Sequence, residues 1–262
     1  MSEWWDKQIY RADQLTSSAN GSTALVAFYA HLLRAQKDVY EFLRSRQNWL
    51  PTGELERDLT IVCDALPAFV KVIASHAPDT LADDALKLLD VPRDQINDHL
   101  LNYWHAPVDT DFFGKAFLQP YMHWLAENGV RPYGREFSEG ERCCPFCGAN
   151  PQVSFLKSKE PSAESGIREL VCALCLSSWE FRRVICANCG EERPAKLAYF
   201  QSPAFDHIRI EACDTCKHYI KGVDLTRLGI AAPLVDDIAS APLDLWAREH
   251  GYRKIELNLV GV

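Results

Sequence analysis

The chain has 262 residues and 47% hydrophobic residues, so it is long enough to bury a core and has an ordinary globular composition. Its formal net charge is −8, with 14 Lys and Arg against 21 Asp and Glu before Cys143, and 14 against 15 from there onward. Neither part has the basic excess that binding to phosphate backbones requires, so we expect no nucleic-acid partner.

Residues 1–130 predict an α-helical domain. Between Ser22 and Arg46, apolar side chains recur every three or four positions, which places them on one face of a helix. Further helices are expected after Gly53 with a kink at Pro67, at about 79–89, at 92–104, and at 110–128 with a bend at Pro120. Residues 131–142 are rich in Gly, charge and turn formers, so they are expected to be a linker.

The chain starts with polar and acidic residues, so we expect no secretory signal. Its best apolar run, residues 24–33, is shorter than a bilayer span, so we expect no membrane partner. Both expectations point to a cytoplasmic protein. In that reducing compartment, paired cysteines are typical of metal sites rather than of disulfides.

Eight of the ten cysteines form four Cys-x-x-Cys pairs within one stretch of the chain. The first pair recurs after 42 positions and the second after 41, which indicates a repeated unit. This spacing lets a tight turn aim two sulfur atoms at one ion, and Gly148 and Gly190 follow where a positive φ is expected. The predicted metal ligands are Cys144, Cys147, Cys172, Cys175, Cys186, Cys189, Cys213 and Cys216.

Two pairings of these four turns are open. Consecutive pairing gives two four-sulfur sites and about two ions per chain. The alternative joins Cys172/Cys175 to Cys186/Cys189 and leaves the outer pairs to meet across about 65 residues, so we favour consecutive pairing. Four thiolates suit mononuclear iron or zinc, and the residues do not separate the two metals.

Alternating stretches between the cysteines predict β-strands. Together with the helices they predict an α+β fold: an α-helical domain, two tandem rubredoxin-like, zinc-ribbon-like modules at 143–184 and 185–224, and a C-terminal helix and tail at 225–262. A strand through residues 178–185 is expected to join the two modules rigidly. Cys63 is expected to be a core residue and Cys143 a bystander.

We expect no catalytic residues and therefore no enzyme, because four-thiolate sites leave no open coordination position and no known catalytic motif is present. Two rival functions remain open. One is a nucleic-acid-binding zinc ribbon, for which the Arg182-Arg183 pair is the local basic hint. The other is a rubredoxin-like electron-transfer or redox protein.

Residues 140–254 contain, in this order, the motifs CPFCG, CxLC, CxxCG, CxxCK, YIKGVDL and LVDDIASAPLDLWAREHGYRK. This order and spacing resemble the formate dehydrogenase accessory (FdhE) proteins. In the helical part, AFLQPYMHWLA is a looser match to the same family. This resemblance implies a cytoplasmic maturation factor. It would bind the catalytic subunit of a formate dehydrogenase before export and hold rubredoxin-like iron at the eight cysteines.

Overall fold

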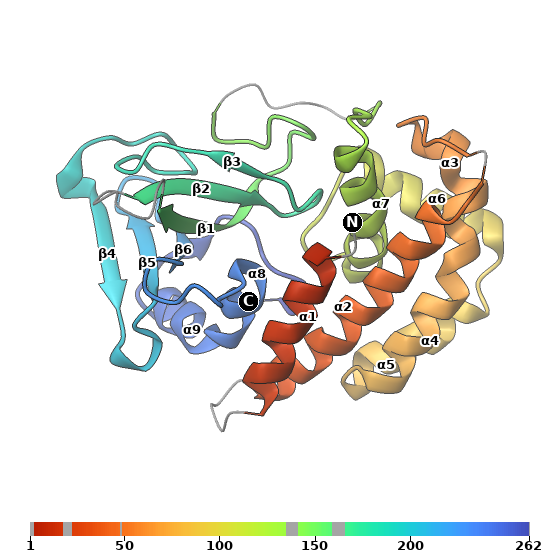
Figure 1. Cartoon of the computed structure of the whole chain (residues 1–262), viewed down its shortest axis with the longest axis horizontal. Helices are drawn as coiled ribbons and strands as arrows, with labels where there is room; N and C mark the ends of the chain where they lie inside the picture. Colours follow the sequence, from red (N-terminus) through yellow and green to blue (C-terminus); the bar gives the residue numbers. More distant parts are fainter. Residues whose placement is uncertain (1–2, 18–22, 48, 135–140, 159–165, 262) are drawn as a thin grey trace.

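The computed structural model describes residues 3–17, 23–47, 49–134, 141–158 and 166–261. A layer of helices packs beside a seven-stranded sheet, and two further helices cover one face of that sheet (Figure 1). The expected α+β class is confirmed. The middle of the expected linker, residues 135–140, lies outside the described residues, and the division into domains at 131–142 stays a prediction.

Apart from the first helix, for which no bounds were predicted, the helices begin and end close to the predicted positions. Their bounds are α1 Glu3–Thr16, α2 Thr23–Arg44, α3 Leu55–Val62, α4 Leu66–His76, α5 Asp79–Leu89, α6 Arg93–His105 and α7 Phe112–Glu127. The kink expected at Pro67 is instead a 3-10 turn at Cys63–Ala65, and Pro67 lies in the first turn of α4. Proline is accepted there because its missing N–H has no partner to lose.

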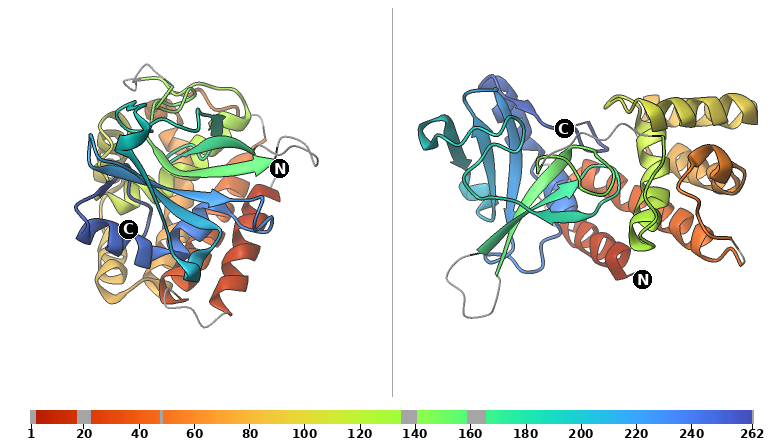
Figure 2. Two further views of the ribbon diagram at one scale, coloured as in Figure 1. Left: turned by 90° about the vertical axis from the view of Figure 1, so that its left-hand side faces the viewer. Right: turned by 90° about the horizontal axis from the view of Figure 1, so that it is seen from above.

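Helix α7 is the centre of the helical layer. Every side chain from Gly114 to Leu125 is buried, which is the pattern of a helix surrounded on all sides. It crosses the middle of the helical layer and contacts α2 and α6 (Figure 2). Asp111 caps its N-terminus by accepting a hydrogen bond from the Gly114 N–H.

One segment, Leu55–His76, has the length and mean hydropathy of a membrane-spanning helix. The expectation that no stretch reaches that length is therefore wrong on these two criteria. In the structure the segment is interrupted by the 3-10 turn, and its buried residues, such as Leu59 and Ile73, belong to the core of the helical layer. Core helices commonly satisfy the same criteria.

The two predicted ribbons form a single sheet. Its strands are β1 Pro151–Ser158, β2 Gly166–Cys172, β3 Ser178–Glu180, β4 Leu197–Gln201, β5 Ile208–Cys213, β6 His218–Asp224 and β7 Arg253–Lys254. The order is β3-β2-β1-β6-β5-β4, with β7 beside β6. Each ribbon is antiparallel, and the two are joined by parallel pairing of β1 with β6, where Val153 lies opposite Lys221.

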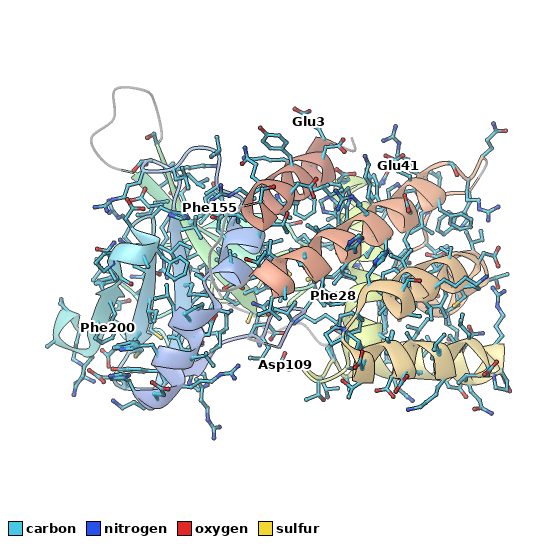
Figure 3. The ribbon with its side chains drawn as sticks, turned by 90° about the horizontal axis from the view of Figure 1, so that it is seen from below. Glu3, Phe28, Glu41, Asp109, Phe155 and Phe200 are labelled. Atoms are coloured by element: carbon cyan, nitrogen blue, oxygen red, sulfur yellow. The ribbon has the colours of Figure 1, made fainter. Side chains whose placement is uncertain are left out.

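The prediction of one strand through residues 178–185 is wrong beyond Glu180. Strand β3 ends there, and the remaining five residues follow an irregular path. Two helices, α8 Pro233–Ala239 and α9 Ala241–Glu249, precede β7, where one C-terminal helix was expected. Ser240 lies between them, and Pro242 occupies the first turn of α9. Helix α8 contacts α1 and α2 as well as β1 and β6, so it joins the helical layer to the sheet (Figure 3).

Candidate metal centres

The fold brings the eight expected sulfur atoms together in two groups. The first site is Cys144, Cys147, Cys172 and Cys175, and the second site is Cys186, Cys189, Cys213 and Cys216. Within each group the sulfur atoms all lie within 4.8 Å of one another. The structure therefore has the consecutive pairing. Among the described residues, these are the groups of His, Cys, Asp or Glu side chains placed closely enough to hold an ion.

Each cysteine pair lies on a tight turn whose last position has a positive φ. As predicted, Gly148 has a φ of 74° and Gly190 a φ of 77°. The equivalent positions of the other two turns hold Leu176 at 62° and Lys217 at 58°. A side chain in this conformation is strained, so these two turns depend on the surrounding structure to hold them.

Backbone N–H groups point at the sulfur atoms inside these turns. Cys172 Sγ accepts from the Leu174 N–H at 3.3 Å, and Cys186 Sγ accepts from the Asn188 N–H at 3.4 Å. Such donors stabilise a thiolate, which is the form that binds metal. Burial acts in the opposite direction and raises the pKa of both Cys172 and Cys186. A bound cation would resolve this conflict by stabilising the charged sulfur atoms.

The sulfur spacing fits a tetrahedral ion. A metal–sulfur bond of about 2.3 Å places the sulfur atoms of such a site about 3.8 Å apart. Two sulfur–sulfur distances in the first site are 3.4 and 3.5 Å, and two in the second site are both 3.7 Å. All are far longer than the disulfide bond of about 2.05 Å. Both sites can therefore hold a metal ion, and four thiolates would close its coordination.

The first site is built into the core against α7. Gln119 Nε2 donates to the Ala173 carbonyl at 2.7 Å, and one turn later His123 Nδ1 lies 3.2 Å from the Cys175 carbonyl. Burial lowers the pKa of His123, so the imidazole is neutral and can donate through Nδ1. The sequence showed no ligand spacing for this histidine. Its part is to position the turn that carries the ligands.

The second site lies toward the solvent. Thr215 Oγ1 donates to Glu191 Oε2 at 2.6 Å and so joins its two turns. His218 Nδ1 lies 2.8 Å from the Cys216 carbonyl, and this side chain is half-buried. Tyr252 donates to Asp214 at 3.0 Å and so attaches the second turn to the C-terminal segment.

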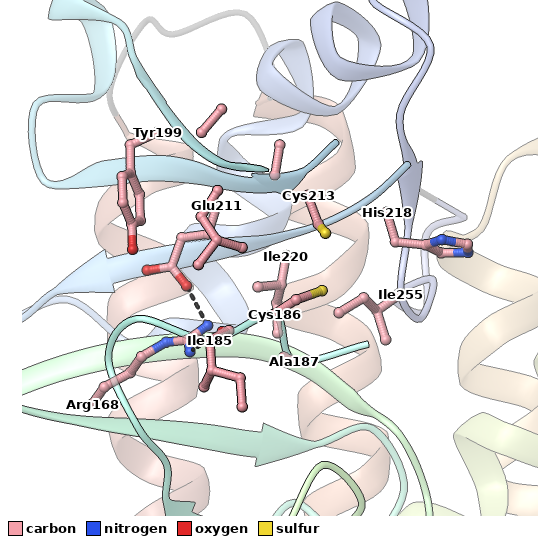
Figure 4. Close-up of a pocket in the computed structure, with 13 residues that line it drawn as sticks. Arg168, Ile185, Cys186, Ala187, Tyr199, Glu211, Cys213, His218, Ile220 and Ile255 are labelled. Atoms are coloured by element: carbon pink, nitrogen blue, oxygen red, sulfur yellow. Dashed lines mark hydrogen bonds and ion pairs between the residues drawn. The ribbon is translucent and has the colours of Figure 1, made fainter. Parts of the chain in front are cut away.

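A buried ion pair connects the two ribbons beside the second site. Arg168 of β2 reaches across the sheet to Glu211 of β5, and the two strands β1 and β6 lie between them (Figure 4). The same guanidinium donates to the carbonyls of Arg182 and Ile185, so it holds the irregular segment between the sites. Gly222 of β6 leaves room for the crossing, because a Cβ there would lie 2.6 Å from Glu211 Oε1.

A second buried cluster, between the sheet and the C-terminal helices, was missed by sequence reasoning. Lys221 of β6 contacts Asp237 of α8 and Asp244 of α9, and Lys254 of β7 binds Asp237 at 2.7 Å. All four side chains are fully buried, and the two positive charges balance the two negative ones. The signal in the sequence that could have indicated this cluster is Lys221, a charged residue among the apolar residues of a predicted strand.

These features define a class: an α+β protein in which a helical layer packs on a double ribbon with two closed four-cysteine sites. Residues 143–183 match the family described as "FdhE, central domain", and residues 184–260 match "FdhE, C-terminal domain". The chain belongs to the FdhE family, and the resemblance seen in the sequence is confirmed.

Relatives agree with this assignment. A protein FdhE homolog of Aquifex aeolicus is 33% identical over 195 residues, which span 73% of this chain and 67% of the relative. One from Pseudomonas aeruginosa is 32% identical over 155 residues, 57% of this chain and 48% of the relative. The aligned segment thus spans two thirds of one relative and about half of the other.

The fold is also that of a solved structure. The crystal structure of the FdhE protein from Pseudomonas aeruginosa matches all of this chain and 97% of that chain, with a TM-score of 0.72 and 22% sequence identity. At this identity the match supports the fold, including the helical layer that lies outside the two matched family domains.

Proposed function

We propose that this chain is an accessory factor in the maturation of a formate dehydrogenase, which binds the catalytic subunit in the cytoplasm before export and catalyses no reaction. Membership of the FdhE family is the observation that carries the proposal. In this proposal both four-cysteine sites hold one ion each, either iron or zinc, and the ions stabilise the surface that the partner contacts.

The geometry of the two sites supports a non-catalytic role. Four sulfur ligands close the coordination of an ion and leave no position for water or substrate. The net charge of −8 disfavours the nucleic-acid alternative, and Arg182 is engaged in ion pairs with Glu141 and Glu192 rather than contributing to a basic surface.

A second candidate function is electron transfer, which one observation favours. Cys189 of the second site is exposed, so an iron ion bound there would lie near the surface and could exchange electrons with a partner. A measured reduction potential together with reduction by a cellular reductase would support this candidate. Iron that stays in one redox state throughout the physiological range would exclude it.

A pull-down tests the main proposal. The tagged full chain should retain the catalytic subunit from cell extract. Deletion of the gene should lower formate dehydrogenase activity without lowering the client transcript. A chain that never retains the subunit, with formate dehydrogenase activity unchanged on deletion, would contradict the proposal.

A further inference from the structure

The two four-cysteine sites differ in access to solvent. All four cysteines of the first site are buried, with exposed fractions of 0–2%. In the second site Cys186 and Cys213 are buried, but Cys216 is half-buried and Cys189 is exposed. The sequence repeat gives no sign of this difference, because both units have the same cysteine spacing.

The difference follows from what covers each site. Helix α7 lies over the second turn of the first site, where Gln119 and His123 bind its carbonyls. The cysteines of the first site belong to the same hydrophobic core as the helical layer. Opening this site would therefore disturb contacts between two layers of the molecule.

The second site has no helix over its turns among the described residues. Its first turn is held by Arg142, which donates to the Asn188 carbonyl, and by the exposed link from Thr215 to Glu191. These contacts are made by side chains at the surface, which contribute little to stability when they break and re-form in water. Cys189 can therefore leave an ion without disturbing the core.

We propose that the second site exchanges its metal ion with soft, thiol- or nitrogen-bearing acceptors, whereas the first site retains its ion as part of the core. An acceptor must approach the ion and replace one sulfur ligand at a time, which requires an accessible sulfur. Cys189 provides that position. The first site offers none without local unfolding, which is slower. This inference rests on the proposal that both sites hold an ion, and not on the identity of the client.

A chelator competition with the full chain loaded with zinc tests the difference. The colorimetric chelator 4-(2-pyridylazo)resorcinol should remove one ion quickly and the second at least about tenfold more slowly, a difference in barrier of at least about 1.4 kcal/mol. Alkylation during the fast phase, followed by mass spectrometry, should label Cys189 and Cys216 before the cysteines of the first site. Release of both ions at one rate, or earlier labelling of Cys144 and Cys147, would overturn the proposal.

A pair of matched variants separates exchange from folding. Cys189→Ser should keep one ion, lose the fast phase and leave the thermal transition of the helices nearly unchanged. Cys147→Ser, at the equivalent position of the first site, should lower that transition. If Cys189→Ser removes the slow phase instead, the assignment is reversed. A chain that takes up no zinc at either site would overturn both this inference and the metal sites themselves, whatever the pull-down gives.

Discussion

Arg11 of α1 and Asp236 of α8 lie 225 positions apart in the chain and form a two-pronged ion pair, with Nε–Oδ2 and Nη2–Oδ1 distances of 3.0 and 2.6 Å. Both side chains are buried, and His207 lies 2.9 Å from the same carboxylate. This contact joins the first helix to the C-terminal segment that covers the sheet.

We predict that Asp236→Asn lowers the free energy of unfolding by about 3 kcal/mol, because the Arg11 charge stays buried without its partner. Burial opposes ionisation of Asp236, but hydrogen bonds from His207 and Arg11 outweigh it and lower the pKa of the carboxyl. The wild-type contribution is therefore present above the unfolded pKa of about 3.9 and is lost as the pH falls through the lower folded pKa.

Urea unfolding between about pH 3 and pH 7 checks both statements. The variant should show a flatter loss of stability on acidification than the wild type. Asp13→Asn is the matched control, because Asp13 forms an exposed pair with Arg34 and should change stability by less than about 1 kcal/mol. Equal effects of the two substitutions would contradict the role given to Asp236.

Lys221→Met should destabilise the protein by about 3–5 kcal/mol, since it leaves Asp237 and Asp244 sharing only Lys254 inside the core. Methionine keeps the length of the side chain and removes the charge. Thermal unfolding measures the loss, and Lys87→Met, which removes an exposed pair with Asp84 on α5, is the control. A variant as stable as the wild type would contradict the claim that the two buried aspartates need both lysines to neutralise them.

Gly222→Ala should cost about 1–3 kcal/mol, because its Cβ would lie 2.6 Å from Glu211 Oε1. That carboxylate cannot move freely, since Arg168 and Ser154 also hold it. Gly229→Ala is the matched control: its nearest neighbour would be 3.8 Å away. Chemical denaturation should separate the two variants, and an equal cost would argue against the crossing of Glu211 over β6.

His123→Ala should speed metal release from the first site severalfold, because the Cys175 carbonyl loses its donor and the turn loses its positioning contact with α7. The change should appear as faster labelling of the first-site cysteines, with the second site unaffected. His76→Ala, an exposed residue, is the control. Unchanged labelling of the first-site cysteines would contradict the positioning role proposed for His123.

Cys186→Ser should destabilise the second ribbon and leave the helical layer largely folded. Cys172→Ser should affect the helices as well, because the first site shares their core. Far-ultraviolet circular dichroism and limited proteolysis measure the two effects. A stable helical fragment ending near residues 130 to 143 is expected from Cys186→Ser. Global unfolding of that variant would contradict the predicted division of the chain.

Local features were predictable from the sequence because a few neighbouring residues determine them. The Cys-x-x-Cys spacing decides which sulfur atoms share a turn, and Gly148 and Gly190 mark the positive φ that each first turn requires. The apolar period of residues 22–46 predicted α2 for the same reason, since one helical face must be buried. The repeat of the unit favoured consecutive pairing of the four turns.

Only the tertiary structure decided how these local parts meet. No local signal marks Leu176 and Lys217 as positions of positive φ, because neighbouring packing and not residue type holds them there. The parallel joining of β1 to β6, the burial of Lys221, and the cover that α7 gives to the first site depend on segments far apart in the chain. The sequence alone determined two equivalent four-cysteine units. Packing against the helices made the first unit part of the core and left the second at the surface. The reason is that the burial of a site depends on which distant segments of the chain the fold places over it.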